Sequence, residues 1–259
     1  MSLAPDTRVI VTGGASGIGR AIADTFAAAG ARLWVIDPGL DALDTCPGDW
    51  GRSPVDASDE QALRLVLAGV EERWGGVDVV CANAGIAGPT APVEQVVLAD
   101  WQRCVAVNLE GAFLTAKHTI PMMKRAGRGA ILLTSSTAGL HGSPNRAPYA
   151  AAKWGVIGLM KTLAMELGPF GIRVNALCPG AVEGPRMEGV LAREAAAKGM
   201  TVEAVRAGYA SGSSMRRWVT AYDVAETALF LASPEARLIS GQAIAIDGHT
   251  ENPDPKPGA

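Results

Sequence analysis

Two side chains four residues apart are the clearest candidates for chemistry in this chain. Tyr149 and Lys153 stand at the two ends of Tyr-Ala-Ala-Ala-Lys, and an i, i+4 spacing places both on one face of a helix. A free phenol has a pKa of about 10, and an adjacent cation lowers that value because it stabilises the phenolate. The pair is therefore a candidate general acid and base for an alcohol–ketone couple. The alternative is an exposed helix that carries both side chains by chance.

Two serines strengthen this interpretation. Ser135 and Ser136 end the predicted strand that precedes the helix, and Ser136 stands 13 residues before Tyr149. A hydroxyl at this place could hydrogen-bond the substrate oxygen and hold it near the phenol.

A glycine-rich turn is the first element that must position these groups. Residues 12–19 read Thr-Gly-Gly-Ala-Ser-Gly-Ile-Gly, between a predicted strand and an Ala-rich helix. Glycines permit a tight turn, and a helix N-terminus offers free N–H groups to a pyrophosphate. The turn therefore predicts a dinucleotide site built from Gly13, Ser16, Gly17, Ile18 and Gly19. Its spacing is GxxxGxG and not the general GxGxxG, so a purely structural corner is the alternative.

An acidic residue at the end of the second predicted strand favours one dinucleotide. Asp37 follows Gly17 by 20 residues, where a carboxylate can accept hydrogen bonds from both adenosine ribose hydroxyls. The same carboxylate would repel a 2′-phosphate, and neither Ser16 nor Pro38 supplies a basic side chain. We therefore expect NAD rather than NADP.

Two more strand ends complete the expected cofactor rim. Asp56 and Ala57 follow the third predicted strand, and Asn83, Ala84 and Gly85 follow the fourth. Ligands of open parallel sheets bind beyond the carboxyl ends of the strands, so these residues are expected to contact the cofactor.

Short apolar runs alternate with helical stretches along the chain, which predicts an α/β fold with a doubly wound parallel sheet covered by helices on both faces. Strands such as Val9-Ile10-Val11 are continuously apolar, as expected of strands buried on both faces. The expected elements are 8–12, 17–30, 32–37, 52–56, 58–74, 77–83, 100–125, 130–135, 148–167, 172–178, 221–232 and 243–247.

Residues 1–259 show no composition break and are expected to form a single domain. Two segments depart from the alternation. Residues 179–218 are rich in Arg, Met, Gly and Ser, and we expect a long irregular connection whose part from about 181 to 218 is a substrate lid. The Pro-rich tail, 249–259, is expected to be mobile.

The composition excludes several functional classes. Of 259 residues, 23 are Lys or Arg and 26 are Asp or Glu, a net charge of −3 with no basic run for nucleic acid. No apolar stretch is long enough for a membrane span, and no secretion signal is visible. The four cysteines lack CxxC spacing, which favours a reducing cytoplasm, and the three histidines form no metal motif, so no metal is expected.

The motifs, in this order and spacing, resemble those of the short-chain dehydrogenase/reductase family over nearly the whole chain. They are the 12–19 turn, Asn83-Ala84-Gly85, Asn108 in Val-Asn-Leu, Ser136, the 149–153 motif, Pro179-Gly180 and Ile246-Asp247-Gly248. The resemblance implies a Rossmann-type fold. It also implies that Ser136 polarises the substrate, that Tyr149 is the acid and base, and that Lys153 binds the nicotinamide ribose and lowers the phenol pKa. Asn108 would position a relay water.

The resemblance further implies cofactor contacts at Pro179, Gly180 and Val182, the last through its backbone at the carboxamide. Gly184 stands where the family commonly has a threonine near the cofactor, so that contact is not expected here. A homotetramer is also implied, because relatives pack the helices over 100–125 and 148–167 across subunits.

The reaction implied is hydride transfer between a secondary alcohol and NAD, with reverse ketone reduction. Candidate substrate contacts are Ser136, His141, Arg146 and Arg186, where an arginine could hold a carboxylate or could equally pair with an acid of the lid. A small polyol or sugar-acid derivative is the expected substrate. The alternatives are a 3-oxoacyl thioester reductase that uses NADPH and a non-catalytic NAD-binding regulator.

Overall fold

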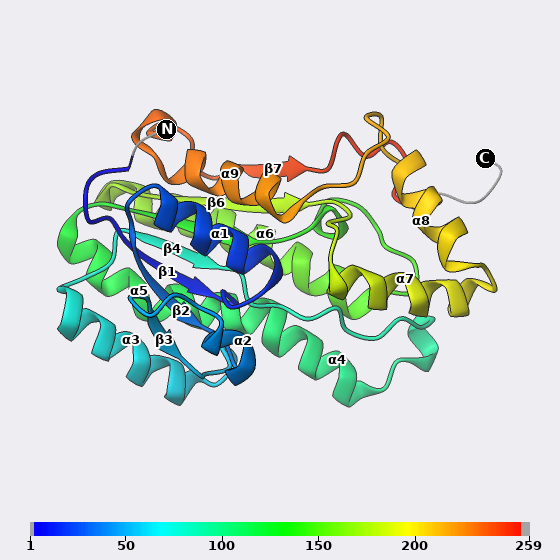
Figure 1. Ribbon diagram of the computed structural model, residues 1–259, viewed down its shortest axis with the longest axis horizontal. Helices are drawn as coiled ribbons and strands as arrows, with labels where there is room; N and C mark the ends of the chain where they lie inside the picture. The colour runs from blue at the N-terminus through cyan, green and yellow to red at the C-terminus, as the bar shows by residue number, and fades with distance from the viewer. Residues whose placement is uncertain (1–2, 255–259) are drawn as a thin grey trace.

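The computed structural model describes residues 3–254, and its centre is a seven-stranded parallel sheet in the order β3-β2-β1-β4-β5-β6-β7 (Figure 1). The order reverses between β1 and β4, so the chain winds outward in both directions, as the sequence predicts. The strands are β1 Arg8–Thr12, β2 Arg32–Ile36, β3 Gly51–Ser53, β4 Val79–Ala82, β5 Gly129–Thr134, β6 Ile172–Pro179 and β7 Ala243–Ile246.

Helices cover both faces of this sheet. The side chains of α1 and α9 pack with one face, and those of α3, α5 and α6 pack with the other. The helices are α1 Gly17–Ala28, α2 Leu40–Asp44, α3 Glu60–Trp74, α4 Leu98–Val105, α5 Gly111–Ala126, α6 Ala147–Leu167, α7 Pro185–Lys198, α8 Val202–Ser211 and α9 Ala221–Ala232. Short 3₁₀ turns lie at Val93–Gln95, Thr137–Gly139, Gly168–Phe170 and Pro234–Ala236.

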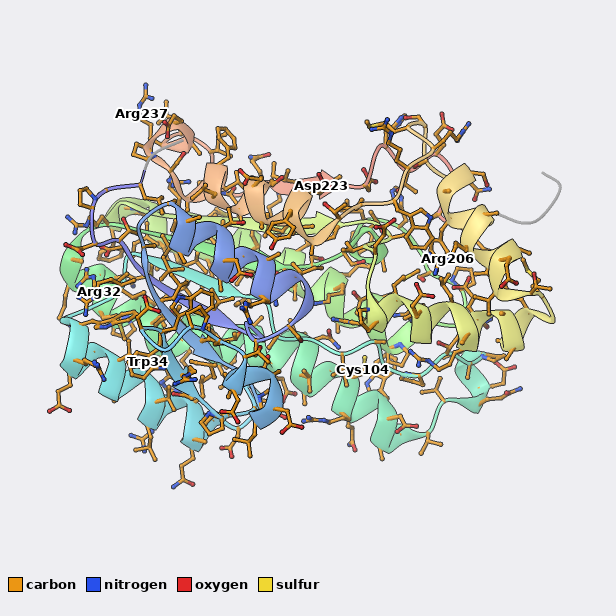
Figure 2. The ribbon with its side chains drawn as sticks, viewed as in Figure 1. Arg32, Trp34, Cys104, Arg206, Asp223 and Arg237 are labelled. Atoms are coloured by element: carbon orange, nitrogen blue, oxygen red, sulfur yellow. The ribbon has the colours of Figure 1, made fainter. Side chains whose placement is uncertain are left out.

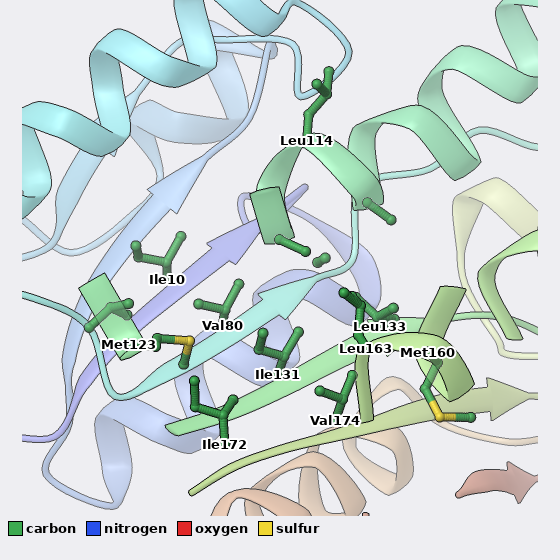
Figure 3. Close-up of a cluster of buried hydrophobic side chains, with 14 of the residues drawn as sticks. Ile10, Val80, Leu114, Met123, Ile131, Leu133, Met160, Leu163, Ile172 and Val174 are labelled. Carbon is green, nitrogen blue, oxygen red and sulfur yellow. The ribbon is translucent and has the colours of Figure 1, made fainter. Parts of the chain in front are cut away.

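The central strands are buried on both faces because their side chains alternate between two cores. Ile10, Val80, Ile131 and Val174 stand in register on four neighbouring strands and form one row of the first core (Figure 3). Burial of each such side chain contributes about 1.5–3 kcal/mol. The residues between them, such as Val9 and Val11, face the second core. This two-sided burial holds the carboxyl ends of the strands rigidly at one edge.

Most expected elements are present, with differences that follow from local structure. The helix expected over 100–125 is α4 and α5 joined by a π-helical turn, Ala106–Glu110. The third strand is shorter than 52–56 and starts one residue earlier. The short helix α2 was not expected, because its five residues carry no long apolar period.

The expectation of an irregular lid over 181–218 is wrong, since the segment contains α7 and α8. Pro185 opens α7, where a missing N–H costs nothing, and Gly199 ends it with a positive φ of 63°. The Thr201 hydroxyl caps α8 by accepting a hydrogen bond from the Ala204 N–H. The Pro and Gly residues of this segment mark helix ends rather than irregular backbone.

Residues 249–254 belong to the tail that was expected to be mobile, and they make hydrogen bonds and ion pairs with the lid. Residues 255–259 of the expected tail lie outside the described residues. Among the described helices, none combines the length and the apolar character needed to cross a bilayer.

Candidate active site

A cavity of about 520 Å³ opens at the carboxyl ends of the strands. It runs from the glycine turn past β4, β5 and β6 to the lid. The cofactor residues expected from the sequence all line it: Gly13, Ser16, Gly17, Ile18, Gly19, Asp37, Asp56, Ala57, Asn83, Ala84, Gly85, Tyr149, Lys153, Pro179, Gly180 and Val182. Ser136, Arg146 and Arg186 also line it. His141 and Asn108 are not among the lining residues.

Close backbone approach explains the glycine turn. A Cβ on Gly19 would lie 1.9 Å from the Gly13 carbonyl oxygen, and a Cβ on Gly13 would lie 2.9 Å from the Ala84 Cα. Gly13 also has a φ of 60°, which side chains rarely adopt. Only glycine therefore lets the turn, the start of α1 and the end of β4 meet. The N-terminus of α1 faces the cavity, where its N–H groups and dipole suit a pyrophosphate.

The ends of β4 and β5 are tied to the same turn by Asn83. Its side-chain N–H₂ donates to the carbonyls of Gly13 at 3.1 Å and Thr12 at 3.3 Å, and its Oδ1 accepts from the Thr134 hydroxyl at 3.2 Å. The amide is thus committed to the protein itself, so Asn83 shapes the cofactor site more than it contacts a ligand.

Two carboxylates lie at the adenosine end. Asp37 accepts hydrogen bonds from the N–H groups of Ala15 at 3.2 Å and Gly39 at 3.0 Å, which fixes its orientation at the end of β2. Asp56 accepts from Ser58 and pairs with Arg103 at 2.6 Å. Burial alone would raise the pKa of Asp56, but these partners outweigh it and hold the pKa below its usual value. Both carboxylates therefore offer oxygen atoms that can accept hydrogen bonds from a ligand.

Tyr149 and Lys153 lie in the first two turns of α6, opposite the end of β5. The Lys153 side chain is buried, and its Nζ donates to the Thr134 carbonyl at 2.8 Å and lies 5.6 Å from the centre of the Tyr149 ring. Burial lowers the pKa of this ammonium, although the tyrosine opposes the effect. The cation is thus fixed in place beneath the phenol.

The surroundings of Tyr149 favour the ionised form of its phenol. Burial raises the pKa of Tyr149, but the positive charges of Lys153, Arg186 and Arg146 and a hydrogen bond with Ser136 outweigh it, and the pKa is lowered from its ordinary value. Ser136 thus stands beside Tyr149, whereas the Ser135 hydroxyl donates to the Lys153 carbonyl at 2.8 Å and is occupied. Ser136 is therefore the serine that can meet a substrate oxygen.

Asn108 lies in the π-helical turn behind these groups. Its N–H₂ donates to the carbonyls of Cys104 at 2.9 Å and Ile86 at 3.0 Å, while its buried Oδ1 has no partner among the described residues. A Cβ on Gly85 would lie 2.7 Å from this oxygen and 3.5 Å from Lys153 Nζ. The missing side chain at Gly85 therefore leaves space between the two groups that suits a bridging water.

Two arginines extend the positive charge around Tyr149. The Arg146 guanidinium carbon lies 4.7 Å from the centre of the Tyr149 ring, and its Nη2 donates to the Ala87 carbonyl at 3.0 Å. Its buried Nε has no partner within residues 3–254. Arg186, on α7, donates to the Gly85 carbonyl at 3.3 Å. The sequence offered both as candidate substrate contacts but gave no sign that their charges also lower the pKa of the phenol.

His141 is placed differently. Its carbonyl accepts from Trp154 Nε1 at 3.4 Å, and its side chain is not part of the cavity lining.

The expected lid does line the cavity, but the sequence did not single out its residues Met187, Val190 and Tyr209, and it missed the tail residues Thr250, Asn252 and Pro253. No local motif marks them, because only the folding of α7 and α8 brings them to the site. Within residues 3–254, no group of three or more His, Cys, Asp or Glu side chains could hold a metal ion.

The residues present fit a nicotinamide dinucleotide. The glycine turn gives the backbone close access, Asp37 offers ribose acceptors, and Lys153 stands where the nicotinamide ribose is expected.

Comparisons with known proteins agree with this geometry. Residues 13–249 match a family model described as enoyl-(acyl carrier protein) reductase. Levodione reductase of Leifsonia aquatica is 35% identical, covering 94% of this chain and 93% of its own. D-beta-hydroxybutyrate dehydrogenase of Rhizobium meliloti (strain 1021) is 35% identical, covering 92% and 96%. A crystal structure of NAD⁺-bound xylitol dehydrogenase superimposes with a TM-score of 0.91 at 27% identity, covering 94% and 98%.

The similarity spans nearly all of each chain, and the relatives act on hydroxyl or carbonyl groups. The protein is thus a nicotinamide-dependent oxidoreductase rather than a non-catalytic regulator. It belongs to the short-chain dehydrogenase/reductase family.

Proposed function

We propose that the protein transfers hydride between a small hydroxy acid, such as a sugar-acid derivative, and NAD. The observation that carries the substrate class is the pair Arg146 and Arg186 beside Tyr149. No ion pair joins either guanidinium to a carboxylate within residues 3–254. A carboxylate on the substrate would accept charge-assisted hydrogen bonds from these guanidinium groups. A neutral polyol, the other substrate expected from the sequence, would leave both guanidinium groups without a carboxylate partner.

The chain's own residues account for the proton. Ser136 holds the alcohol oxygen, and the Tyr149 phenolate takes the hydroxyl proton. Lys153 stabilises the phenolate, and the space between Asn108 Oδ1 and Lys153 Nζ holds the water through which the proton leaves. When bound, NAD⁺ accepts the hydride from the alcohol carbon. In the reverse direction Tyr149 protonates the ketone oxygen.

Asp37 supports NAD as the preferred cofactor. Its carboxylate is fixed by Ala15 and Gly39 at the end of β2, where it would accept from ribose hydroxyls and repel a 2′-phosphate. Among the similar proteins, a D-beta-hydroxybutyrate dehydrogenase supports the choice of a hydroxy acid, and an NAD⁺-bound xylitol dehydrogenase supports the choice of NAD.

A carrier-bound 3-oxoacyl thioester is the second candidate substrate, because the matched family model is described as a carrier-protein reductase. That reaction would use NADPH and a basic docking surface. Asp37 and the net charge of −3 both disfavour it.

A matched pair of alcohols tests the substrate class. We expect NADH formation with 3-hydroxybutyrate to exceed that with butane-1,3-diol, its neutral analogue. Replacement of Arg186 by methionine should raise KM for the acid about tenfold, because a charge-assisted contact is lost. KM for the diol should not change. Arg193→Met on the same helix is the control. Equal activity with acid and diol in the unaltered protein would exclude the carboxylate site.

We also propose that the chain forms a homotetramer in a reducing cytoplasm. Phe113 on α5 and Trp154 and Met165 on α6 are 44%, 51% and 81% exposed, which is costly for apolar side chains on neighbouring helices. All four cysteines are buried and free. Light scattering should give four times the chain mass, and Met165→Lys should reduce it.

A further inference from the structure

The tail segment 249–254 packs against the lid of the same chain. The N–H groups of Glu251 and Asn252 donate to the Gly212 carbonyl at 2.9 and 3.0 Å. Thr250 forms an antiparallel bridge with the buried Ser213. The start of the segment is fixed as well, because Asp247 accepts from the N–H and the hydroxyl of Thr250 at 3.1 and 2.6 Å. The tail therefore runs as an extra strand-like segment beside the loop that follows α8.

A network of charges fixes the far end of this segment. Lys198, at the end of α7, donates to Asp254 at 2.7 Å and to Glu194 at 2.6 Å, and Glu194 accepts from the Tyr209 hydroxyl at 2.7 Å. The lysine and both carboxylates are largely shielded from solvent, with 14–27% of each side chain exposed. Such partly buried pairs are costly to break, because the remaining charge loses its partner. Asp254 therefore joins the tail to α7 and, through Glu194, to α8.

The lid that the tail holds has a small hydrophobic core of its own. Leu191 and Ala195 of α7 pack with Val205 of α8, apart from the two cores of the sheet. Arg206, labelled on α8 in Figure 2, pairs with Glu188 and lies 5.2 Å from the Trp218 ring. Since this cluster is small, α7 and α8 depend on outside contacts for their position, and the tail supplies several of them.

The same segment reaches the cavity. Thr250, Asn252 and Pro253 line it together with Met187 of α7 and Tyr209 of α8. The match to the family model ends at residue 249, so this part of the lining lies beyond the shared family sequence. Figure 1 shows the red C-terminal segment beside the yellow α8.

We propose that residues 250–253 form the outer wall of the substrate pocket and set the length of substrate it accepts, with Lys198 and Asp254 as positioning residues. The proposal rests on the proposed function for the choice of probes. The tail acts through shape, because Asn252 and Pro253 occupy the space that a longer substrate would need. A substrate that is one or more methylene groups too long is rejected by such a wall.

Five variants test the proposal. A chain that ends at Glu251 removes the wall residues Asn252 and Pro253 and the positioning residue Asp254. A chain that ends at Pro255 is its matched control. Asp254→Asn removes only the charge, and Asp254→Glu restores it. Glu251→Gln breaks the ion pair between Glu251 and Arg216. Both side chains are about half exposed, so this change should have little effect on the substrate pocket.

The readout is the ratio of kcat/KM for 3-hydroxyoctanoate to kcat/KM for 3-hydroxybutyrate. We expect this ratio to rise about tenfold in the chain that ends at Glu251, a typical value for the fit of a methylene or more in a pocket. Asp254→Asn should raise it less, and Asp254→Glu, Glu251→Gln and the Pro255 chain should match the unaltered protein. The affinity for NADH should stay unchanged in all of them, since the tail does not touch the glycine turn.

Hydrogen exchange separates this proposal from the proposed function. With NADH bound, the backbone amides of residues 185–211 should exchange faster in the chain that ends at Glu251 and in Asp254→Asn than in the unaltered protein. Exchange of residues 8–28 should not change, and both results are independent of which alcohol is the substrate. If neither hydroxy acid is oxidised but exchange in 185–211 rises, the proposed substrate class fails and the positioning role of the tail stands. Unchanged exchange, or an unchanged ratio in a folded and active Glu251 chain, would overturn the wall.

Discussion

The two ends of the cavity are built by different means. At the cofactor end, the glycine turn, β1 and β4 meet through backbone atoms, so closely that a Cβ added to Gly19 would lie 1.9 Å from a carbonyl oxygen. At the substrate end, α7, α8 and the tail meet through long side chains such as Lys198, Glu194 and Asp254. The first arrangement tolerates no change of shape, whereas the second can be rebuilt by substitution.

This difference matches the tasks of the two ends. A cofactor is the same molecule in every turnover, so rigid backbone contacts and fixed N–H groups suit it. A substrate pocket must exclude competitors of similar size, and side chains on separate helices can be adjusted one at a time. Tyr149, Lys153 and Ser136 lie between the two ends, on α6 and at the end of β5.

The largest expected effect comes from a change at Tyr149, between the two ends of the cavity. Tyr149→Phe removes the group that takes the proton in the proposed mechanism and should lower kcat about 10³- to 10⁴-fold, the upper range for a general acid and base. NADH binding should change little, because the ring remains. Stopped-flow turnover and NADH fluorescence measure the two effects, and Tyr222→Phe on the exposed face of α9 is the control. Retained turnover would remove Tyr149 from its assigned role.

The cofactor end should break on the addition of one methyl group. Gly19→Ala places a Cβ against the Gly13 carbonyl, so the turn and α1 must separate. We expect the Kd for NADH to rise about 100-fold, as for the loss of several well-placed contacts. Gly69→Ala on α3 is the matched control, since a Cβ there meets no atom within 4 Å, and it should leave Kd unchanged and stability equal or higher. Normal NADH binding by Gly19→Ala would mean that the turn is not the pyrophosphate site.

The sequence was informative where short motifs determine structure. The turn over 12–19, the strand ends and the Tyr149–Lys153 pair are local patterns, and the cavity brings them together. The lid helices were missed because their start and end signals, Pro185 and Gly199, were interpreted as irregular backbone. The contacts of the tail could not be predicted, because Lys198, the partner of Asp254, stands 56 residues earlier and no spacing rule connects the two.

A smaller effect distinguishes the two cofactors. Asp37→Ala removes the carboxylate that disfavours a 2′-phosphate, and the ratio of kcat/KM for NADP to that for NAD should rise about 10- to 100-fold. Asp37→Asn separates charge from size, since it keeps a hydrogen-bonding side chain. Asp41→Ala, on the exposed surface of α2, should leave the ratio unchanged. If the unaltered protein already prefers NADP, the proposal of NAD is wrong.

The smallest expected effect tests whether a lid residue also influences the pKa of Tyr149, which lies between the two ends of the cavity. In the proposed mechanism alcohol oxidation needs the Tyr149 phenolate, so kcat/KM should rise with pH and level off above the pKa of the phenol. Burial raises that pKa, but the positive charges of Lys153, Arg186 and Arg146 lower it by more. The net effect is a pKa below the ordinary value of tyrosine. Arg186→Met removes one of these cations, so the pKa rises and the rising limb of the profile moves to higher pH.

The expected shift of the profile is small, less than about one pH unit, because Arg186 is exposed and its charge is screened by solvent. Arg193→Met, on the exposed side of the same helix, should leave the profile in place. A profile that does not move with Arg186→Met would confine the lid to substrate recognition and leave Lys153 as the principal cation that sets the tyrosine pKa.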